Sequence, residues 1–193
     1  QARTDRAVCV RADEGSEAHV YGRYSNPVWT HLESAVARLE EATAALTFGS
    51  GLAAATAALR VLVPPGTVLL VPADGYYQVR RYAAESLAPM GVTVREATAE
   101  TADVVLAETP TNPELDVVDL HRLAGVCHRR GARLLVDNTT ATPLGQLPLS
   151  LGADLVVASA TKALAGHSDL VAGYVAGSQP ELMAAIERER LLA

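Results

Sequence analysis

Five short, continuous apolar runs constrain the fold of this chain more than any other feature. The runs lie at residues 68–71, 92–94, 104–106, 134–136 and 155–157. Unbroken apolar runs of this length are typical of strands in a parallel sheet that is covered on both faces. Helical segments lie between most of the runs, including residues 79–88 and 119–130. The alternation predicts an α/β fold with a mostly parallel central sheet flanked by helices.

The remaining segments divide the chain into two parts. Residues 1–28 lack strong periodicity and are predicted to form an extended N-terminal arm, whereas residues 29–193 are predicted to form one α/β domain. The chain begins without Met and ends at Ala193 inside an apparent helix. We therefore expect it to be part of a longer protein.

Three further helices are predicted from local signals. The pattern Thr30-x-x-Glu33 is typical of a capping box and predicts a helix over residues 30–44. The alanine-rich residues 52–63 predict a second helix, which the following Pro-Pro-Gly ends. Ser178 is the predicted N-cap of a final helix that continues to the end of the chain.

The composition excludes several classes of protein. The chain has 16 basic and 22 acidic residues, a net charge of −6, and lacks the basic patch that nucleic-acid binding requires. Cys9 and Cys127 form no C-x-x-C pair and the five histidines are dispersed, so neither a disulfide framework nor a metal site is predicted. No apolar run approaches the ~18 residues of a membrane span, and the first residues lack a signal-peptide core. We expect a cytoplasmic protein that binds a small molecule.

Polar side chains follow three of the predicted strands. Asp137 comes directly after residues 134–136, Asn112 follows residues 104–106, and Lys162 follows residues 155–157. Ligands of open α/β sheets bind at the carboxyl ends of the strands, so one ligand is expected to reach all three side chains. The alternative is that Asp137 caps a turn and that Lys162 is a solvated surface residue.

The segment Ser159-Ala160-Thr161-Lys162 matches the needs of one particular cofactor, pyridoxal 5'-phosphate. Its lysine supplies an amine that can form a Schiff base, and its two hydroxyls are hydrogen-bond donors for a phosphate. A carboxylate such as Asp137, held against the ring nitrogen, keeps that nitrogen protonated and the ring electron-withdrawing.

Two further segments offer contacts for such a cofactor. Gly51 and Leu52 stand where a glycine-containing loop enters a helix, a position that favours phosphate binding, although glycines there more often serve the turn itself. Tyr76 follows the strand at 68–71 and offers an aromatic face for stacking, with ordinary packing as the alternative. In the arm, Tyr21 and Arg23 are suited to phosphate oxygens, although exposed arm residues usually have no specific role.

Taken together, these motifs resemble the Cys/Met-metabolism family of pyridoxal phosphate enzymes, which includes cystathionine γ-synthase, cystathionine lyase and methionine γ-lyase. The resemblance spans nearly the whole chain. It rests on five motifs in family order: Tyr21-Gly22-Arg23-Tyr24-Ser25-Asn26-Pro27, Ser50-Gly51-Leu52-Ala53-Ala54, Glu108-Thr109-Pro110-Thr111-Asn112-Pro113, Val136-Asp137-Asn138-Thr139, and Ser159 through Asp169. It implies the large domain of the fold type I pyridoxal phosphate transferases.

The resemblance also implies roles for individual residues. Lys162 carries the Schiff base and later moves protons, Asp137 pairs with the pyridinium nitrogen, and Asn112 contacts the ring hydroxyl. Tyr76 is the ring-stacking residue and a potential acid or base. Hence Lys162, Tyr76 and Asp137 are the predicted catalytic residues.

The phosphate is expected to be held from two sides. Ser159, Thr161 and the backbone at Gly51 and Leu52 come from the same subunit. In the family, the residues that match Tyr21 and Arg23 reach into a neighbouring subunit's site, which implies a homodimer or homotetramer.

Three departures from the family pattern bear on the substrate. The stacking tyrosine is followed by Tyr77, Gln78 and Val79, whereas family members often have Tyr-Gly-Gly-Thr here. Gln78 occupies the position where methionine γ-lyases typically have a cysteine, which disfavours that activity. The smaller C-terminal domain, whose arginine binds the substrate carboxylate in the family, is absent from this chain.

The main functional hypothesis is a pyridoxal phosphate-dependent carbon–sulfur lyase that acts by elimination on cystathionine, cystine or cysteine. A cystathionine γ-synthase-like transferase, which replaces the γ-substituent, uses the same machinery and stays open. A hypothesis of another class is a truncated or degenerate cofactor-binding module of a larger biosynthetic assembly.

Overall fold

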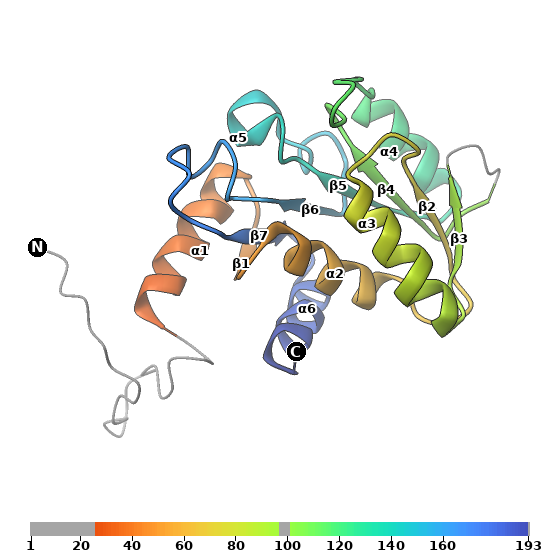
Figure 1. Cartoon of the computed structure of the whole chain (residues 1–193), viewed down its shortest axis with the longest axis horizontal. Helices are drawn as coiled ribbons and strands as arrows, with labels where there is room; N and C mark the ends of the chain where they lie inside the picture. The colour runs from red at the N-terminus through yellow and green to blue at the C-terminus, as the bar shows by residue number, and fades with distance from the viewer. Residues whose placement is uncertain (1–25, 97–100, 193) are drawn as a thin grey trace, which may run out of the picture.

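A computed structural model describes residues 26–96 and 101–192 of the chain (Figure 1). The strands are β1 (Ala44–Phe48), β2 (Val68–Val71), β3 (Thr93–Glu96), β4 (Val104–Glu108), β5 (Arg133–Asp137), β6 (Leu155–Ala158) and β7 (Gly173–Gly177). The helices are α1 (Pro27–Leu39), α2 (Gly51–Leu62), α3 (Tyr77–Tyr82), α4 (Leu120–Arg129), α5 (Thr142–Gly145) and α6 (Pro180–Leu192). All five predicted apolar runs contribute to strands.

The strands form one sheet in the order β1-β7-β6-β5-β4-β2-β3. Strands β6, β5, β4, β2 and β3 run parallel to one another, whereas β7 is antiparallel to both β1 and β6. The predicted α/β class with a mostly parallel sheet is therefore confirmed.

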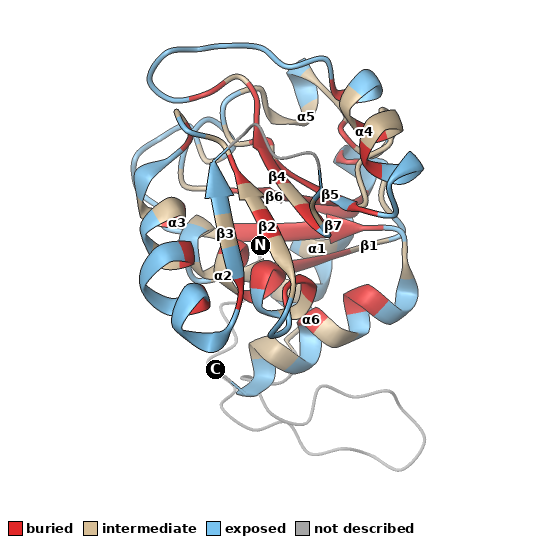
Figure 2. Cartoon of the chain, turned by 90° about the vertical axis from the view of Figure 1, so that its right-hand side faces the viewer, coloured by how far each residue is buried: buried red, intermediate tan, exposed pale blue. Residues whose placement is uncertain are grey.

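Helices cover both faces of the sheet, as the continuous apolar runs require (Figures 1 and 2). Helices α2, α3 and α6 pack on one face, against alternate strand residues that include Leu106 and Leu135. Helices α1 and α4 pack on the other face, α4 against Leu134 and Val136. Side chains alternate between the faces along a strand, so Asp137, two residues after Leu135, belongs to the α2 face.

The first helix differs from its prediction. It begins at Pro27, three residues early, because the Asn26 side chain caps it by accepting the Val28 N–H at 2.8 Å. The predicted capping box is therefore wrong. Glu33 instead accepts the N–H of Thr47 at 2.8 Å on the neighbouring strand β1. The extended arm predicted over residues 1–28 thus overlaps the start of α1.

Two strands were not predicted. The helix predicted over residues 30–44 ends early, at Leu39, and residues 44–48, for which no strand is predicted, form β1 against β7. Strand β7, with glycines at both of its ends, is buried at every position. Strand β3 also differs from its prediction, since it pairs only with β2 and is exposed at most positions instead of covered on both faces.

The other predicted helices are confirmed with small changes. Helix α2 begins at Gly51, α4 spans nearly all of residues 119–130, and α6 begins at Pro180. The helix predicted over 79–88 begins at Tyr77 and continues through a π-helical turn at Ala83–Leu87 and a 3-10 turn at Ala88–Met90.

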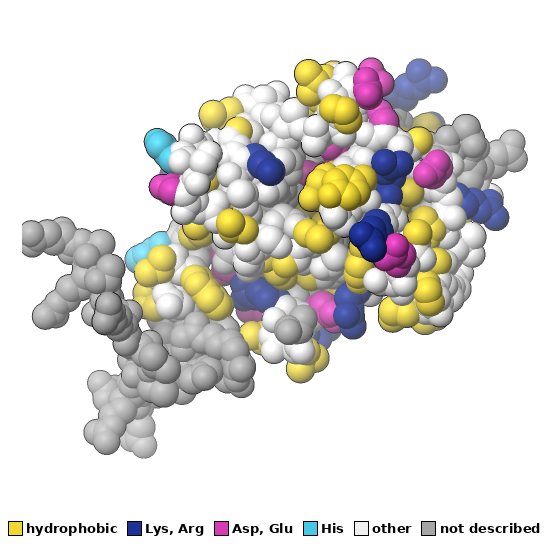
Figure 3. Space-filling view, in the orientation of Figure 1, with side chains coloured by type: hydrophobic (Ala, Val, Ile, Leu, Met, Phe, Trp, Pro, Cys, Tyr) yellow, Lys and Arg dark blue, Asp and Glu magenta, His cyan; other side chains and the backbone are white. Residues whose placement is uncertain are grey.

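The described surface agrees with the charge pattern of the sequence. Figure 3 shows basic and acidic side chains interspersed on one face of the molecule. Within residues 26–96 and 101–192, no group of His, Cys, Asp and Glu is arranged to hold a metal ion. None of the described helices has the length and apolar character needed to cross a membrane. The cytoplasmic location stays a prediction.

Candidate active site

A cavity of about 290 Å³ opens at the carboxyl ends of β4, β5 and β6. Every predicted site residue within the described part of the chain lines it. Its lining residues are Ser50, Gly51, Leu52, Tyr76, Val79, Glu108, Asn112, Asp137, Thr139, Thr140, Ser159, Thr161, Lys162 and Val171. Tyr21 and Arg23 lie outside the described residues, so their predicted roles stay predictions.

Asp137 occupies the last position of β5, on the face that α2 covers. Its Oδ1 accepts two hydrogen bonds from Thr139, from the backbone N–H at 3.0 Å and from the hydroxyl at 2.5 Å. Burial raises the pKa of Asp137, and the two hydrogen bonds oppose that shift. Because a buried carboxylate is stabilised by a nearby cation, this site favours a ligand that carries positive charge beside Asp137.

Thr139 joins Asp137 to the lysine-bearing segment. Its Oγ1 donates to Asp137 and also accepts the backbone N–H of Ser159 at 2.8 Å. A single hydroxyl thus fixes the end of β5 against the segment that follows β6. Thr139 belongs to the motif Val136-Asp137-Asn138-Thr139, which assigns it no role. Its position two residues beyond an apolar strand was the available signal.

The start of α2 closes another side of the cavity. Ser50 is the N-cap, and its Oγ accepts the Ala53 N–H at 3.0 Å. A Cβ on Gly51 would lie 2.5 Å from the Ser159 Cβ, so only glycine allows this helix end to approach the segment that bears Lys162. The first backbone N–H groups of a helix lack partners within it and face outward with the positive end of the dipole. Gly51 and Leu52 are therefore placed to bind an anion.

Lys162 and Thr161 lie in a turn after β6. The backbone N–H of Lys162 donates to the Ser159 carbonyl at 3.2 Å. The Thr161 hydroxyl donates to the Ala172 carbonyl at 3.0 Å and accepts the Ala172 N–H at 2.9 Å. Thr161 thus anchors the Lys162 turn to the segment before β7, and its predicted contact with a phosphate stays a prediction.

Tyr76 and Glu108 form the remaining wall. The Tyr76 ring is 38% exposed and makes an edge-on contact with Tyr77, with ring centroids 5.4 Å apart. The backbone N–H of Tyr76 donates to Glu108 Oε2 at 2.6 Å. Burial is the main cause that raises the pKa of Glu108 to about 7, and the nearby Asp137 and Asp74 carboxylates raise it further. Glu108 is a site residue that sequence reasoning missed, although it ends β4 in register with Asp137.

The residues of the cavity fit pyridoxal phosphate. Lys162 offers an amine, the start of α2 offers N–H groups to the phosphate, and the buried Asp137 suits a cationic ring nitrogen. A sequence profile of the Cys/Met metabolism PLP-dependent enzymes matches residues 2–191. The chain belongs to this family. Pyridoxal phosphate is accordingly its cofactor, as predicted.

Relatives with different activities share this domain. The chain is 45% identical over 184 residues to a putative cystathionine gamma-lyase of Streptomyces coelicolor, covering 89% of this chain and 47% of the relative. It is 40% identical over 178 residues to cystathionine gamma-synthase 1 of Arabidopsis thaliana, a chloroplastic protein, covering 86% and 32%. The crystal structure of a cystathionine gamma lyase from Micromonospora echinospora superimposes with a TM-score of 0.89 at 37% identity, over 96% of this chain and 52% of that one. The chain thus spans half or less of the length of the curated relatives it matches.

The fold of the chain agrees with that of its relatives. The fold type I large domain implied by the sequence motifs agrees with the similarity to these pyridoxal phosphate enzymes. The antiparallel strand β7, which the sequence did not predict, is part of that domain and carries the segment to which Thr161 binds.

Proposed function

We propose that this chain is the cofactor-binding domain of a pyridoxal phosphate-dependent carbon–sulfur lyase. Its substrate would be a sulfur-containing amino acid such as cystathionine, cystine or cysteine. One observation carries the proposal: Lys162, Asp137 and the start of α2 meet around a single cavity in a chain of this family. The 45% identity to the putative cystathionine gamma-lyase supports elimination as the reaction.

Each wall of the cavity would contact a different part of the cofactor. Lys162 would bind the aldehyde carbon, Asp137 the ring nitrogen and Asn112 the ring hydroxyl. Tyr76 would cover the ring face. The phosphate would lie against Ser159 and Thr161 on one side and the backbone of Gly51 and Leu52 on the other.

When bound, pyridoxal phosphate supplies an electron sink for negative charge at the substrate α-carbon. The Lys162 amine, displaced by the substrate amine, would remove the α-proton and return it later as an acid. Asp137 would hold the ring nitrogen protonated, and Thr139 would keep the Asp137 carboxylate in place through Oδ1. The Tyr76 hydroxyl is the second candidate for moving a proton.

Absorbance and peptide mapping test the cofactor assignment. Protein mixed with pyridoxal phosphate is expected to develop a visible band that borohydride abolishes, and digestion should recover the label on the Lys162 peptide. Label on another lysine, or the absence of any band, would contradict the assignment.

Product assays on the parent protein then test the reaction. A lyase releases pyruvate or 2-oxobutyrate with ammonia from cystathionine, cystine or cysteine. The 40% identity to cystathionine gamma-synthase 1 favours γ-replacement as the second candidate. That activity would appear only when a thiol amino acid is added as second nucleophile. Cofactor binding without turnover of any substrate would support a non-catalytic module instead.

We further propose that the enzyme is a homodimer or homotetramer in which Tyr21 and Arg23 complete the neighbouring subunit's site. A subunit-mixing experiment tests this. Arg23→Ala and Lys162→Ala proteins should each be inactive, whereas their mixture should regain roughly a quarter of the activity through hybrid dimers with one intact site. If the mixture stays inactive although hybrids form, the two residues do not act across the interface.

A further inference from the structure

One buried carboxyl group connects two of the loops that line the cavity. Glu108 is 8% exposed, and its Oε2 accepts the backbone N–H of Tyr76 at 2.6 Å. The nearby backbone of Asn112 favours the ionised form of this carboxyl group and so lowers its pKa. Glu108, at the end of β4, thus holds Tyr76, which comes from the loop after β2.

The loop that carries Tyr76 passes unusually close to this carboxyl group. A Cβ on Gly75 would lie 2.9 Å from Glu108 Oε2 and 2.5 Å from Pro72 Cγ. With any larger residue at this position, either the loop or the Glu108 side chain would have to shift. Two residues allow this contact: the acid Glu108 at the end of β4 and the glycine Gly75 directly before Tyr76.

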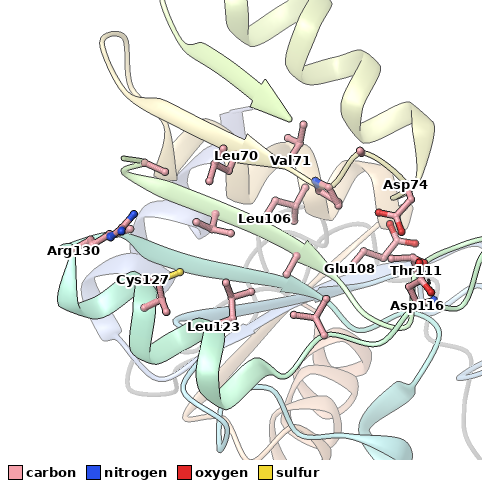
Figure 4. Close-up of a pocket in the computed structure, with 18 residues that line it drawn as sticks. Leu70, Val71, Asp74, Leu106, Glu108, Thr111, Asp116, Leu123, Cys127 and Arg130 are labelled. Atoms are coloured by element: carbon pink, nitrogen blue, oxygen red, sulfur yellow. Dashed lines mark hydrogen bonds between the residues drawn. The ribbon is translucent and has the colours of Figure 1, made fainter. Parts of the chain in front are cut away.

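The surroundings of Glu108 favour its neutral form. Asp137 of β5 and Asp74 of the β2–α3 loop face it and, together with burial, raise its pKa to about 7. Arg80 of α3 lines a small adjoining cavity with it, and Lys162 lies across the main cavity. Figure 4 shows Glu108 near Asp74 at the polar end of a second cavity, of about 580 Å³, between α4 and the sheet.

We propose that Glu108 is a positioning residue whose ionised carboxylate holds the Tyr76 loop, and with it the Tyr76 ring, over the cofactor. The inference rests on the proposed function and assigns Glu108 no contact with the substrate. Hydrogen bonds to an ionised acceptor are about twice as strong as those to a neutral one. The loop is accordingly held more firmly after Glu108 loses its proton.

Amide NMR tests the contact itself, without the cofactor. The chain has six tyrosines, so protein labelled with ¹⁵N-tyrosine gives at most six amide signals. A Tyr76→Phe protein identifies the Tyr76 signal. We expect this signal to move downfield between pH 5.5 and 8 with a midpoint near 7, and to lose that titration in Glu108→Gln.

Cofactor affinity tests the consequence. At pH 8 the Kd of Glu108→Gln for pyridoxal phosphate should be about tenfold higher than that of the unchanged protein, because a charge-assisted hydrogen bond is lost. At pH 5.5 Glu108 is itself protonated, and the two Kd values should converge. The ratio of the two values cancels any pH dependence that the two proteins share.

Two further variants separate positioning from a general effect on structure. Gly75→Ala should weaken pyridoxal phosphate binding with Glu108 intact, because the loop moves away. Asp74→Asn, a matched acid-to-amide change in the same loop, should keep the Tyr76 titration with its midpoint at lower pH. Circular dichroism at each pH excludes unfolding as the cause.

The possible outcomes separate this inference from the proposed function. An unaltered Tyr76 titration in Glu108→Gln, or a Kd ratio that is constant with pH, would overturn the role of Glu108 while the Lys162 label stands. Failure of the unchanged protein to bind pyridoxal phosphate would instead overturn the proposed function, and the Tyr76 titration would still report on the contact.

Discussion

Glu108 and Glu40 are two buried acids on opposite faces of the sheet. Glu108 is 8% exposed and Glu40 is 0% exposed. Burial is the main cause that raises the pKa of both carboxyl groups. They differ in what they bind. Glu108 accepts the N–H of a loop residue that lines the cavity, whereas Glu40 binds side chains inside the fold.

Glu40, at the end of α1, belongs to a buried polar network beneath the α1 face. Its Oε1 accepts the Tyr174 hydroxyl at 2.5 Å and the Asn138 amide at 3.5 Å. Asn138 in turn exchanges hydrogen bonds with Gln146, which donates to the Thr109 carbonyl at 2.8 Å. The network therefore joins α1, β7 and the loops after β4 and β5, and none of these hydrogen bonds goes to a residue that lines the cavity.

Burial thus raises the pKa of two carboxyl groups that have different roles. The buried acid of the α1 face belongs to a network of hydrogen bonds that joins elements of the fold, whereas the buried acid of the α2 face lines a cavity that a ligand can enter. A raised pKa alone does not distinguish a structural acid from a functional one. The role follows from the residues that the acid positions. Substitutions on the α2 face should therefore affect cofactor binding and substitutions on the α1 face should affect stability.

Lys162→Ala should have the largest effect, and only on function. Lyase activity of the parent protein should fall by at least about 10³-fold, because both the covalent attachment and the proton carrier are lost. The side chain is exposed, so the free energy of unfolding should change by less than about 0.5 kcal/mol. Steady-state assays and urea denaturation measure the two quantities. A large loss of stability would contradict the division between the faces.

Glu40→Ala should show the reverse pattern. Removing the acceptor leaves the Tyr174 hydroxyl buried without its partner and opens a cavity. The free energy of unfolding should therefore fall by about 3 kcal/mol. Urea denaturation measures this, with the exposed Glu114→Ala as the matched control at less than about 0.5 kcal/mol. The protein that remains folded should bind pyridoxal phosphate normally. Weakened binding at full folding would show that the network reaches the active site.

The pH dependence of stability should separate Glu108 from other carboxyl groups. Its pKa is about 7 in the folded protein and 4.5 ordinarily, so the folded state holds the extra proton between these values. The stabilisation that Glu108 contributes to the folded state is therefore fully present below about pH 4.5 and is lost as the pH rises through 7. Without cofactor, the unchanged protein should lose about 2 kcal/mol from this group between pH 5 and 8.

Glu108→Gln should lack this part of the pH dependence, and its stability should exceed that of the unchanged protein at pH 8. Urea denaturation at several pH values checks both statements. Parallel profiles for the two proteins would mean that another group titrates in this range.

Ser50→Ala should have the smallest effect, and on both properties. Loss of the α2 N-cap should cost about 1 kcal/mol of stability. Cofactor affinity should also fall, since the first turn of α2 is the proposed phosphate contact. Ser34→Ala, an exposed change inside α1, is the control and should alter neither property measurably. Reduced stability with unchanged affinity would argue against a phosphate at this helix end.

Much of the α2-face site was predictable because it follows from a rule about strand ends. Asp137 and Lys162 follow apolar runs, and in a parallel sheet such residues meet at one edge. Glu108 also stands at the end of a strand but has no predicted role, because the sequence does not show which loop residue its carboxyl group contacts.

The α1 face was much less predictable. Glu40 stands beside Glu41 in a segment that has the composition of an exposed helix end, and only tertiary packing shows that one of the two is fully buried. β1 and β7 were missed for a related reason. Alanine and glycine give weak local signals, and pairing across more than 100 residues decides their conformation.

The place of β7 between β1 and β6 determines when the active site can form during synthesis. The two segments that we propose to hold the phosphate, residues 50–52 and 159–162, are connected through the start of β7, because Gly173 packs against the Ser50 backbone and Ala172 binds Thr161. In a nascent chain that stops short of residue 173, β1 has no partner strand and one edge of β6 is unpaired. We therefore expect the start of α2 and the Lys162 segment to be fixed against each other only after β7 has paired with both β1 and β6.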